Sequence, residues 1–143
     1  MTSIDPLVLG VCDGYKRAVY EKDVEAFLGL YHPEARVFDT WGVWSYEGIG
    51  ERREVIEKWF SSLGEERVRV AIDRIRAVVV DGMAMVSARV IYAALSTSGE
   101  ELRSMQNRLT WVLKPERATW RIFHEHTSVP IGFNDLKGML QRE

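Results

Sequence analysis

The sequence predicts an α+β fold in which helices come first and a mostly antiparallel sheet follows. The spacing of apolar residues changes from about 3.6 to about 2 after Gly64, which indicates a change from helices to strands. Short turn signals, of which Asp81-Gly82 is the clearest, separate the long segments beyond that point. Helices followed by hairpin-connected strands are typical of α+β folds rather than of alternating α/β folds.

Length and composition fit one globular domain over residues 1–143. Hydrophobic residues make up 46% of the chain, and the formal net charge of −2 argues against nucleic acid as a partner. The single cysteine, Cys12, cannot form an internal disulfide, which favours the reducing cytoplasm. The sequence has neither the runs of a signal peptide nor an apolar run of about 18 residues, so we expect no membrane partner.

Three helices are expected before Gly64. The first has Asp5 as its N-cap, Pro6 at its first position and one apolar stripe that includes Tyr15. Asp23 can cap a second helix over residues 24–31, which His32-Pro33 should end because the residue before a proline leaves the α region. The third is expected over residues 51–63, with Gly64 behind it.

Strand patterns lie before and after the third helix. In residues 35–39 the period of two puts Val37 and Asp39 on one face, and residues 40–50 form a loop with aromatic anchors. After Gly64 the apolar register shifts once, between Ile72 and Ile75, which indicates a β-bulge and a bent sheet. Four long strands are expected over residues 68–79, 83–95, 102–113 and 120–129, and residues 134–141 form a short helix or tail.

Both faces of the last two expected strands carry large apolar side chains. Trp120 and Ile122 share one face, and Phe123 and Val129 share the other. Helices can cover only one face of such a sheet, and a monomer would leave a large apolar patch exposed. We therefore expect a homodimer through the outer sheet face.

Tyr15 and Asp39 are the first candidate pair for chemistry. Tyr15 lies on the inward stripe of the first helix, and Asp39 ends the first strand on the inward face. A carboxylate in an apolar cavity can move protons, and a tyrosine hydroxyl can donate a hydrogen bond to a developing oxyanion. The plainer alternative is a core tyrosine and a turn aspartate.

The last strand holds a second group of candidates. His124 and His126 share one face and could line a pocket, bind a metal with a third ligand, or serve the structure alone. Glu125 points the other way, so we expect it to be an exposed or interface charge. Arg108 lies in mid-strand, where a buried guanidinium needs a carboxylate or a ligand as partner.

Aromatic side chains could wall a cavity for a flat apolar ligand, although core packing is the commoner fate of such residues. The candidates are Trp41, Trp44, Trp59 and Tyr92. The sequence contains no glycine-rich phosphate loop, no nucleophile elbow and no Cys–His nucleophile pair. We expect neither a cofactor nor a metal.

Several segments resemble the SnoaL-like group of the nuclear transport factor 2-like superfamily, over almost the whole chain. They are LYHPEA at residues 30–35, YEG at 46–48, RLT at 108–110 and WRIFHEHTSVP at 120–130. The last segment also resembles the association domain of calcium/calmodulin-dependent protein kinase. The resemblance implies a cystatin-like cone: a curved, mostly antiparallel sheet wrapped by three N-terminal helices, with a cavity at its open end and usually a dimer.

Ketosteroid isomerases share that fold and place a catalytic tyrosine and a proton-shuttling aspartate where Tyr15 and Asp39 fall here. The resemblance therefore implies cavity roles for both residues. A further aspartate of the isomerases is replaced here by the segment that ends in Arg108, which favours anionic ligands over steroids.

Three functions follow as hypotheses, since this fold hosts many functions. The preferred one is binding of a small molecule through Asp39, Arg108 and a histidine, with aromatic walls. The second is an isomerase, cyclase or dehydratase in which Asp39 is the base and Tyr15 or His124 stabilises the enolate. The third is a non-catalytic homo-oligomerisation module.

Overall fold

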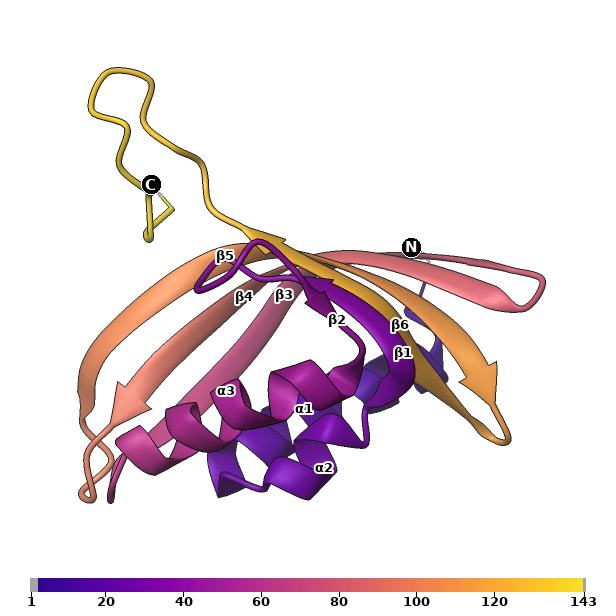
Figure 1. Cartoon of the computed structure of the whole chain (residues 1–143), viewed down its shortest axis with the longest axis horizontal. Coiled ribbons are helices and arrows are strands. Elements are labelled where there is room, and N and C mark those ends of the chain that lie inside the picture. The colour runs from indigo at the N-terminus through magenta and orange to yellow at the C-terminus, as the bar shows by residue number, and fades with distance from the viewer. Residues whose placement is uncertain (1–2, 143) are drawn as a thin grey trace.

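The computed structural model describes residues 3–142 and has the expected α+β architecture. The sheet is curved and unclosed, in the order β2-β1-β6-β5-β4-β3. All neighbouring strands are antiparallel except β1 and β6, which run parallel. The three helices lie together under the concave side of the sheet, and the opposite, convex side is free of helices (Figure 1).

The first two helices begin where the sequence places their caps. In α1 (Pro6–Glu21), the Asp5 carboxylate accepts a hydrogen bond from the Leu7 backbone N–H at 2.8 Å, and Lys22 ends the helix in the left-handed conformation. Asp23 caps α2 (Val24–Leu28) in the same way. Helix α3 (Ile49–Ser62) starts two residues before the expected position and is followed by Gly64 at a φ of +58°.

The second helix is shorter than predicted, because Tyr31 belongs to β1 (Tyr31–Phe38) and not to the helix. Its neighbour in the sheet is Ile122 of β6 (Thr119–Ser128), 91 positions away along the chain. This long-range pairing outweighs the local helical spacing, and His32-Pro33 therefore lies within a strand. Strand β2 (Tyr46–Glu47), within the expected loop, pairs with the other edge of β1.

The long strands and the predicted bulge are confirmed. Strand β3 (Arg67–Val80) pairs with β4 (Met83–Leu95), and its register shifts between Asp73 and Arg76, where Arg74 has a φ of +53°. Strand β5 (Glu101–Glu116) pairs with β4 on one side and β6 on the other. The extra residue in β3 bends the sheet toward the helices.

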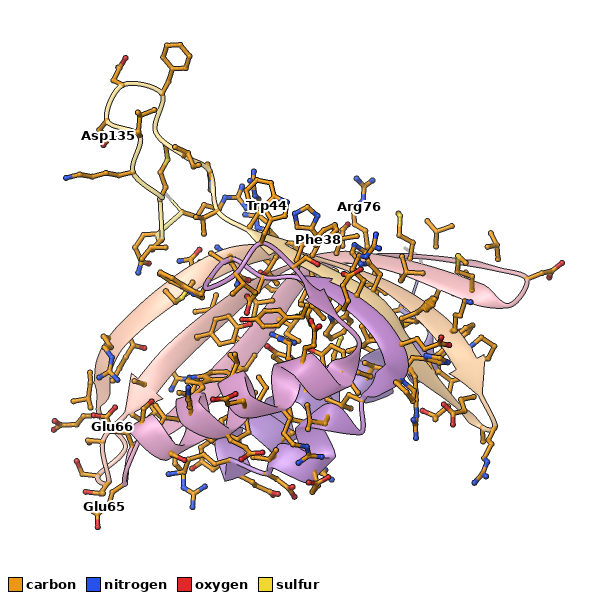
Figure 2. The ribbon with its side chains drawn as sticks, viewed as in Figure 1. Phe38, Trp44, Glu65, Glu66, Arg76 and Asp135 are labelled. Atoms are coloured by element: carbon orange, nitrogen blue, oxygen red, sulfur yellow. The ribbon has the colours of Figure 1, made fainter. Side chains whose placement is uncertain are left out.

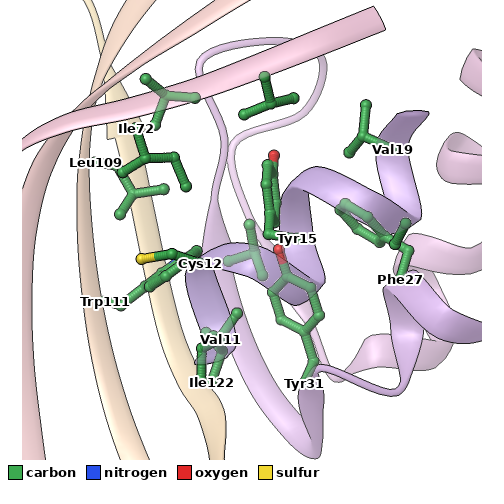
Figure 3. Close-up of a cluster of buried hydrophobic side chains, with 14 of the residues drawn as sticks. Val11, Cys12, Tyr15, Val19, Phe27, Tyr31, Ile72, Leu109, Trp111 and Ile122 are labelled. Atoms are coloured by element: carbon green, nitrogen blue, oxygen red, sulfur yellow. The ribbon is translucent and has the colours of Figure 1, made fainter. Parts of the chain in front are cut away.

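The core lies between the helices and the concave face of the sheet. Trp111 and Ile122 of the sheet pack near Tyr15, Tyr31 and Phe27 (Figure 3). The aromatic rings stack in tilted pairs, with the centroids of Tyr15 and Trp111 5.9 Å apart. These residues fill one part of the concave side, and a cavity remains in another part.

The chain ends in an extended arm rather than in a helix. Residues 133–135 form a turn, and Ile131 pairs with Gly138 in an isolated bridge. The Gln106 backbone N–H donates to the Leu140 carbonyl oxygen at 2.8 Å, so the arm returns to β5. None of the helices within residues 3–142 is long and apolar enough to cross a lipid bilayer.

Candidate functional site

A cavity of about 620 Å³ opens between α3 and the concave face of the sheet. Its volume is in the usual range for small-molecule sites. One wall is the apolar side of α3, and the opposite wall comes from β3, β4 and β5. The apolar and aromatic lining residues are Tyr15, Trp41, Val55, Ile56, Trp59, Leu63, Val68, Tyr92, Ala94, Met105 and Leu140.

Asp39 is the carboxylate that faces this cavity. It directly follows β1, and its side chain keeps 17% of its surface exposed. The Thr127 hydroxyl donates to Asp39 Oδ1 at 3.1 Å, and Arg52 Nη2 donates to Oδ2 at 3.3 Å. Each carboxylate oxygen therefore has one protein partner and further lone pairs available for a ligand.

Arg52 ties Asp39 to a second carboxylate, that of Glu125. The Arg52 side chain is 5% exposed, and its Nη1 lies 3.4 Å from Glu125 Oε2. Glu125 Oε1 accepts hydrogen bonds from the Tyr31 hydroxyl at 2.5 Å and from Trp111 Nε1 at 2.9 Å. One buried cation thus serves two carboxylates, and we call Asp39, Arg52 and Glu125 the charged triad.

Two tyrosine hydroxyls lie beside the triad on the cavity wall. Tyr15 Oη and Tyr92 Oη are 2.8 Å apart, and either can be the donor. Burial raises the pKa of Tyr15 well above that of an ordinary tyrosine, and the neighbouring Tyr92 adds to the effect. Burial likewise raises the pKa of Tyr92. Both groups stay protonated at neutral pH, and the pair retains one hydroxyl proton for a ligand.

Asn107 adds a neutral polar group to the cavity lining. It comes from β5, is 6% exposed, and its Oδ1 has no hydrogen-bond partner among residues 3–142. A buried amide oxygen without a partner costs free energy, so such groups are unusual in folded proteins. The Asn107 amide oxygen is therefore a hydrogen-bond acceptor that still needs a donor.

Five of the sequence-predicted site residues meet in the cavity: Tyr15, Asp39, Trp41, Trp59 and Tyr92. They come from α1, α3, β4 and the segment after β1. The prediction that Val37 and Asp39 share the inward face is confirmed, because Val37 is buried and Asp39 lines the cavity. Asp39 is paired with Arg52 and not with Arg108.

The expectation that His124, His126 and Arg108 reach the cavity is wrong. His124 Nδ1 lies 2.8 Å from the Arg36 carbonyl oxygen, and Arg108 Nε donates to the Ser128 hydroxyl at 3.1 Å, both on the convex side. His126 lies beside His124, with 6.4 Å between ring centroids. The alternation of β6 therefore turns its histidines away from the helices.

Trp44 is a second correction, because it lies in the loop after β1, is 97% exposed and points away from the cavity on the convex side (Figure 2). Glu125 is a third, since it is 1% exposed and not an interface charge. Neighbours in a strand point to opposite faces, so Glu125 points inward because His124 and His126 point outward.

The sequence interpretation missed Arg52, Glu125 and Asn107, although the sequence holds a signal for each. Arg52 precedes Ile56 and Phe60 by one and two helical turns, so it lies on the buried stripe of α3. Asn107 alternates with Leu109 and Trp111 on the inward face of β5. Charged or polar residues on these apolar faces mark the site.

Among residues 3–142, no group of three or more His, Cys, Asp or Glu side chains is arranged to hold a metal ion. The two carboxylates of the charged triad, Asp39 and Glu125, have Arg52 between them.

The chain belongs to the SnoaL-like domain family, whose model matches residues 8–132. Among solved structures, it is similar to an NTF2-like protein of unknown function from Pseudomonas putida KT2440, with a TM-score of 0.80 and 14% identity over 95% of this chain and 93% of that one. NTF2 denotes nuclear transport factor 2. No curated protein sequence matches the chain.

Two further structural relatives have names that refer to function or assembly. A candidate calcium/calmodulin-dependent protein kinase II association domain from Xanthomonas campestris has a TM-score of 0.73 and 16% identity, over 89% of this chain and 88% of that one. A candidate dehydratase of the NTF2-like family from Streptomyces avermitilis has a TM-score of 0.72 and 14% identity, over 88% and 96%. At this identity, the likeness establishes the shared fold.

Proposed function

We propose that this SnoaL-like protein binds a small, flat, mostly apolar molecule in the cavity between α3 and the sheet. The observation that carries the proposal is a hollow of about 620 Å³ with aromatic walls, next to buried polar groups. One of these is Asn107 Oδ1, which has no hydrogen-bond partner among residues 3–142. Core packing would have filled such a space, since protein interiors leave few voids. Asp39 and the Tyr15–Tyr92 pair provide the polar contacts that orient the molecule.

A cavity-filling variant tests this proposal. Ala94→Phe puts a ring into the cavity, whereas Ala71→Phe, the matched control, adds the same ring on an exposed position of β3. Binding of naphthalene-based probes is measured by isothermal titration calorimetry. We expect Ala94→Phe to weaken binding at least tenfold and Ala71→Phe to leave it unchanged. Equal affinities in both folded variants would contradict a cavity site.

A second candidate function is enzymatic: an isomerase, cyclase or dehydratase acting on a carbonyl compound. It is favoured by the presence of Asp39 and the Tyr15–Tyr92 hydroxyl pair on the lining of one cavity. Asp39 takes a proton from the carbon next to the carbonyl, and the electron pair moves to the carbonyl oxygen, which accepts a tyrosine hydrogen bond. Return of the proton to another carbon completes an isomerisation.

Deuterium exchange separates enzyme from binding protein. Bicyclic and tetracyclic ketones are incubated with the protein in heavy water, and loss of the α-proton signals is followed by NMR. An enzyme should exchange these protons at least about 100-fold faster than its Asp39→Asn variant, the usual contribution of a general base. Exchange equal in the two proteins points to binding without catalysis.

The third candidate is an assembly role, and it includes the homodimer that we propose through the convex face. Val78, Met85 and Val112 are neighbours across β3, β4 and β5 on that face, and Val78 and Met85 are about half exposed. Light scattering should give twice the chain mass, and Met85→Lys should give the single mass. A wild-type monomer at micromolar concentration would rule out this dimer.

We propose that residues 1–143 form one domain that acts in the cytoplasm, where Cys12, which is buried, stays reduced. Limited proteolysis tests the first statement by the absence of a stable internal fragment. Cell fractionation tests the second.

A further inference from the structure

The charges around the cavity do not balance. Within residues 3–142 the lining holds one carboxylate, Asp39, and two arginines, Arg52 and Arg103. Arg103 reaches outward to Glu66, with 2.8 Å between Nη2 and Oε1, so these two charges cancel at the rim. Arg52 is shared between Asp39 and Glu125, which leaves the charged triad with one excess negative charge.

That excess charge is presented to the cavity by Asp39. Its side chain is 17% exposed, compared with 5% for Arg52 and 1% for Glu125. Both residues line the cavity, and the carboxylate offers a ligand more exposed surface than the cation does. An anionic head group at this position faces like charge in a low dielectric, whereas a donor head group gives Asp39 a further hydrogen bond.

The rest of the lining favours the same kind of ligand. The rings of Trp59 from α3 and Tyr92 from β4 form an edge-to-face pair, with 6.2 Å between their centroids, and both line the cavity. Aromatic faces carry negative potential and attract cations and donor groups, and they offer a flat ligand large apolar contacts. The excess carboxylate and the aromatic walls thus both favour a ligand that is a cation or donates a hydrogen bond.

We propose that the cavity selects ligands that are not anionic and whose head group, a hydroxyl or an ammonium on a flat aromatic body, donates a hydrogen bond to Asp39. This selection rests on the cavity being the binding site proposed above. It reverses the expectation of anionic ligands, because Arg52, the arginine beside Asp39, is already paired with the two carboxylates of Asp39 and Glu125.

Three probes with the same rings and different heads test the selection: 2-naphthylmethylamine, 2-naphthalenemethanol and 2-naphthoate. Calorimetric titration of the wild-type protein should give at least about tenfold tighter binding for the amine and the alcohol than for naphthoate, as expected for a hydrogen bond to a charged group. The order of the amine and the alcohol tells whether the head is a cation or a neutral donor.

Asp39→Asn is the informative variant, because it leaves Arg52 and Glu125 as a balanced pair. It should weaken amine binding about tenfold or more and strengthen naphthoate binding. Asp13→Asn, an equal charge change at an exposed position of α1, should alter neither. Naphthoate binding as tightly as the amine to the wild-type protein overturns the selection but leaves the cavity site standing. Failure of all three probes to bind overturns both.

Discussion

Replacing Arg52 with Met should destabilise the protein more than any surface charge change. The substitution keeps a long apolar stem but leaves Asp39 and Glu125 without their cation. Removing one partner of a buried ion pair costs about 3–5 kcal/mol. The lower end applies here, because Tyr31 and Trp111 still donate to Glu125 and because Asp39 can be hydrated from the cavity.

The expected loss of unfolding free energy is therefore about 3 kcal/mol, or a decrease of about 10 °C in Tm for a chain of this length. Urea titration followed by circular dichroism measures the first quantity, and calorimetry measures the second. The guanidinium also lies 5.7–5.8 Å from the ring centroids of Phe27, Tyr31 and Tyr46, so the lost contacts are aromatic as well as ionic.

The next residue provides the control. Arg53 pairs with Glu25 at 2.6 Å, but both side chains are about half exposed or more, so Arg53→Met should cost less than about 1 kcal/mol. In a double-mutant cycle, Arg52→Met combined with Glu125→Gln should cost less than the sum of the single changes. Equal losses of unfolding free energy for Arg52→Met and Arg53→Met would refute the argument that burial gives the charged triad its large contribution to stability.

Three smaller predictions follow. Stability should fall as pH rises above about 10, because the unfolded chain then loses tyrosine protons that Tyr15 and Tyr92, with raised pKa values, retain in the folded protein. NMR ring signals of Tyr15 or Tyr92 that titrate before the protein unfolds would contradict this. Arg74→Gly should stabilise the protein by up to about 1 kcal/mol, since it relieves a left-handed residue, whereas Arg76→Gly in the regular strand should destabilise it; urea titration measures both. Burial raises the pKa of Cys12, so thiol reagents should label it only as the protein unfolds, and fast native labelling would disprove this.

Local signals were enough for most of the fold. The caps Asp5 and Asp23 mark helix starts, Asp81-Gly82 marks the β3–β4 turn, and the register change near Arg74 marks the bulge, because each depends on neighbours in the chain. Tyr31 was misassigned because its structure depends on β6, which no local window contains.

The site was harder to predict, because it depends on which face of each element turns inward. Asp39 could be found, since Val37 fixes the inward face of its strand. The sequence pattern of β6 does not show which of its two faces turns inward, and the face with His124 and His126 is in fact the outward one. The decisive residue there, Glu125, can be buried because Arg52, Tyr31 and Trp111 all pair with its carboxylate.

The parallel pairing of β1 with β6 has a consequence for how the protein is made. Asp39 and Thr127 are 88 positions apart, so the aspartate emerges from the ribosome long before its partner exists. Loop closure over such a distance is slow compared with forming helices or hairpins. We expect the nascent chain to hold its helices and central hairpins in place while the ligand site waits for the last strand, which makes that site the final part of the molecule to become ordered.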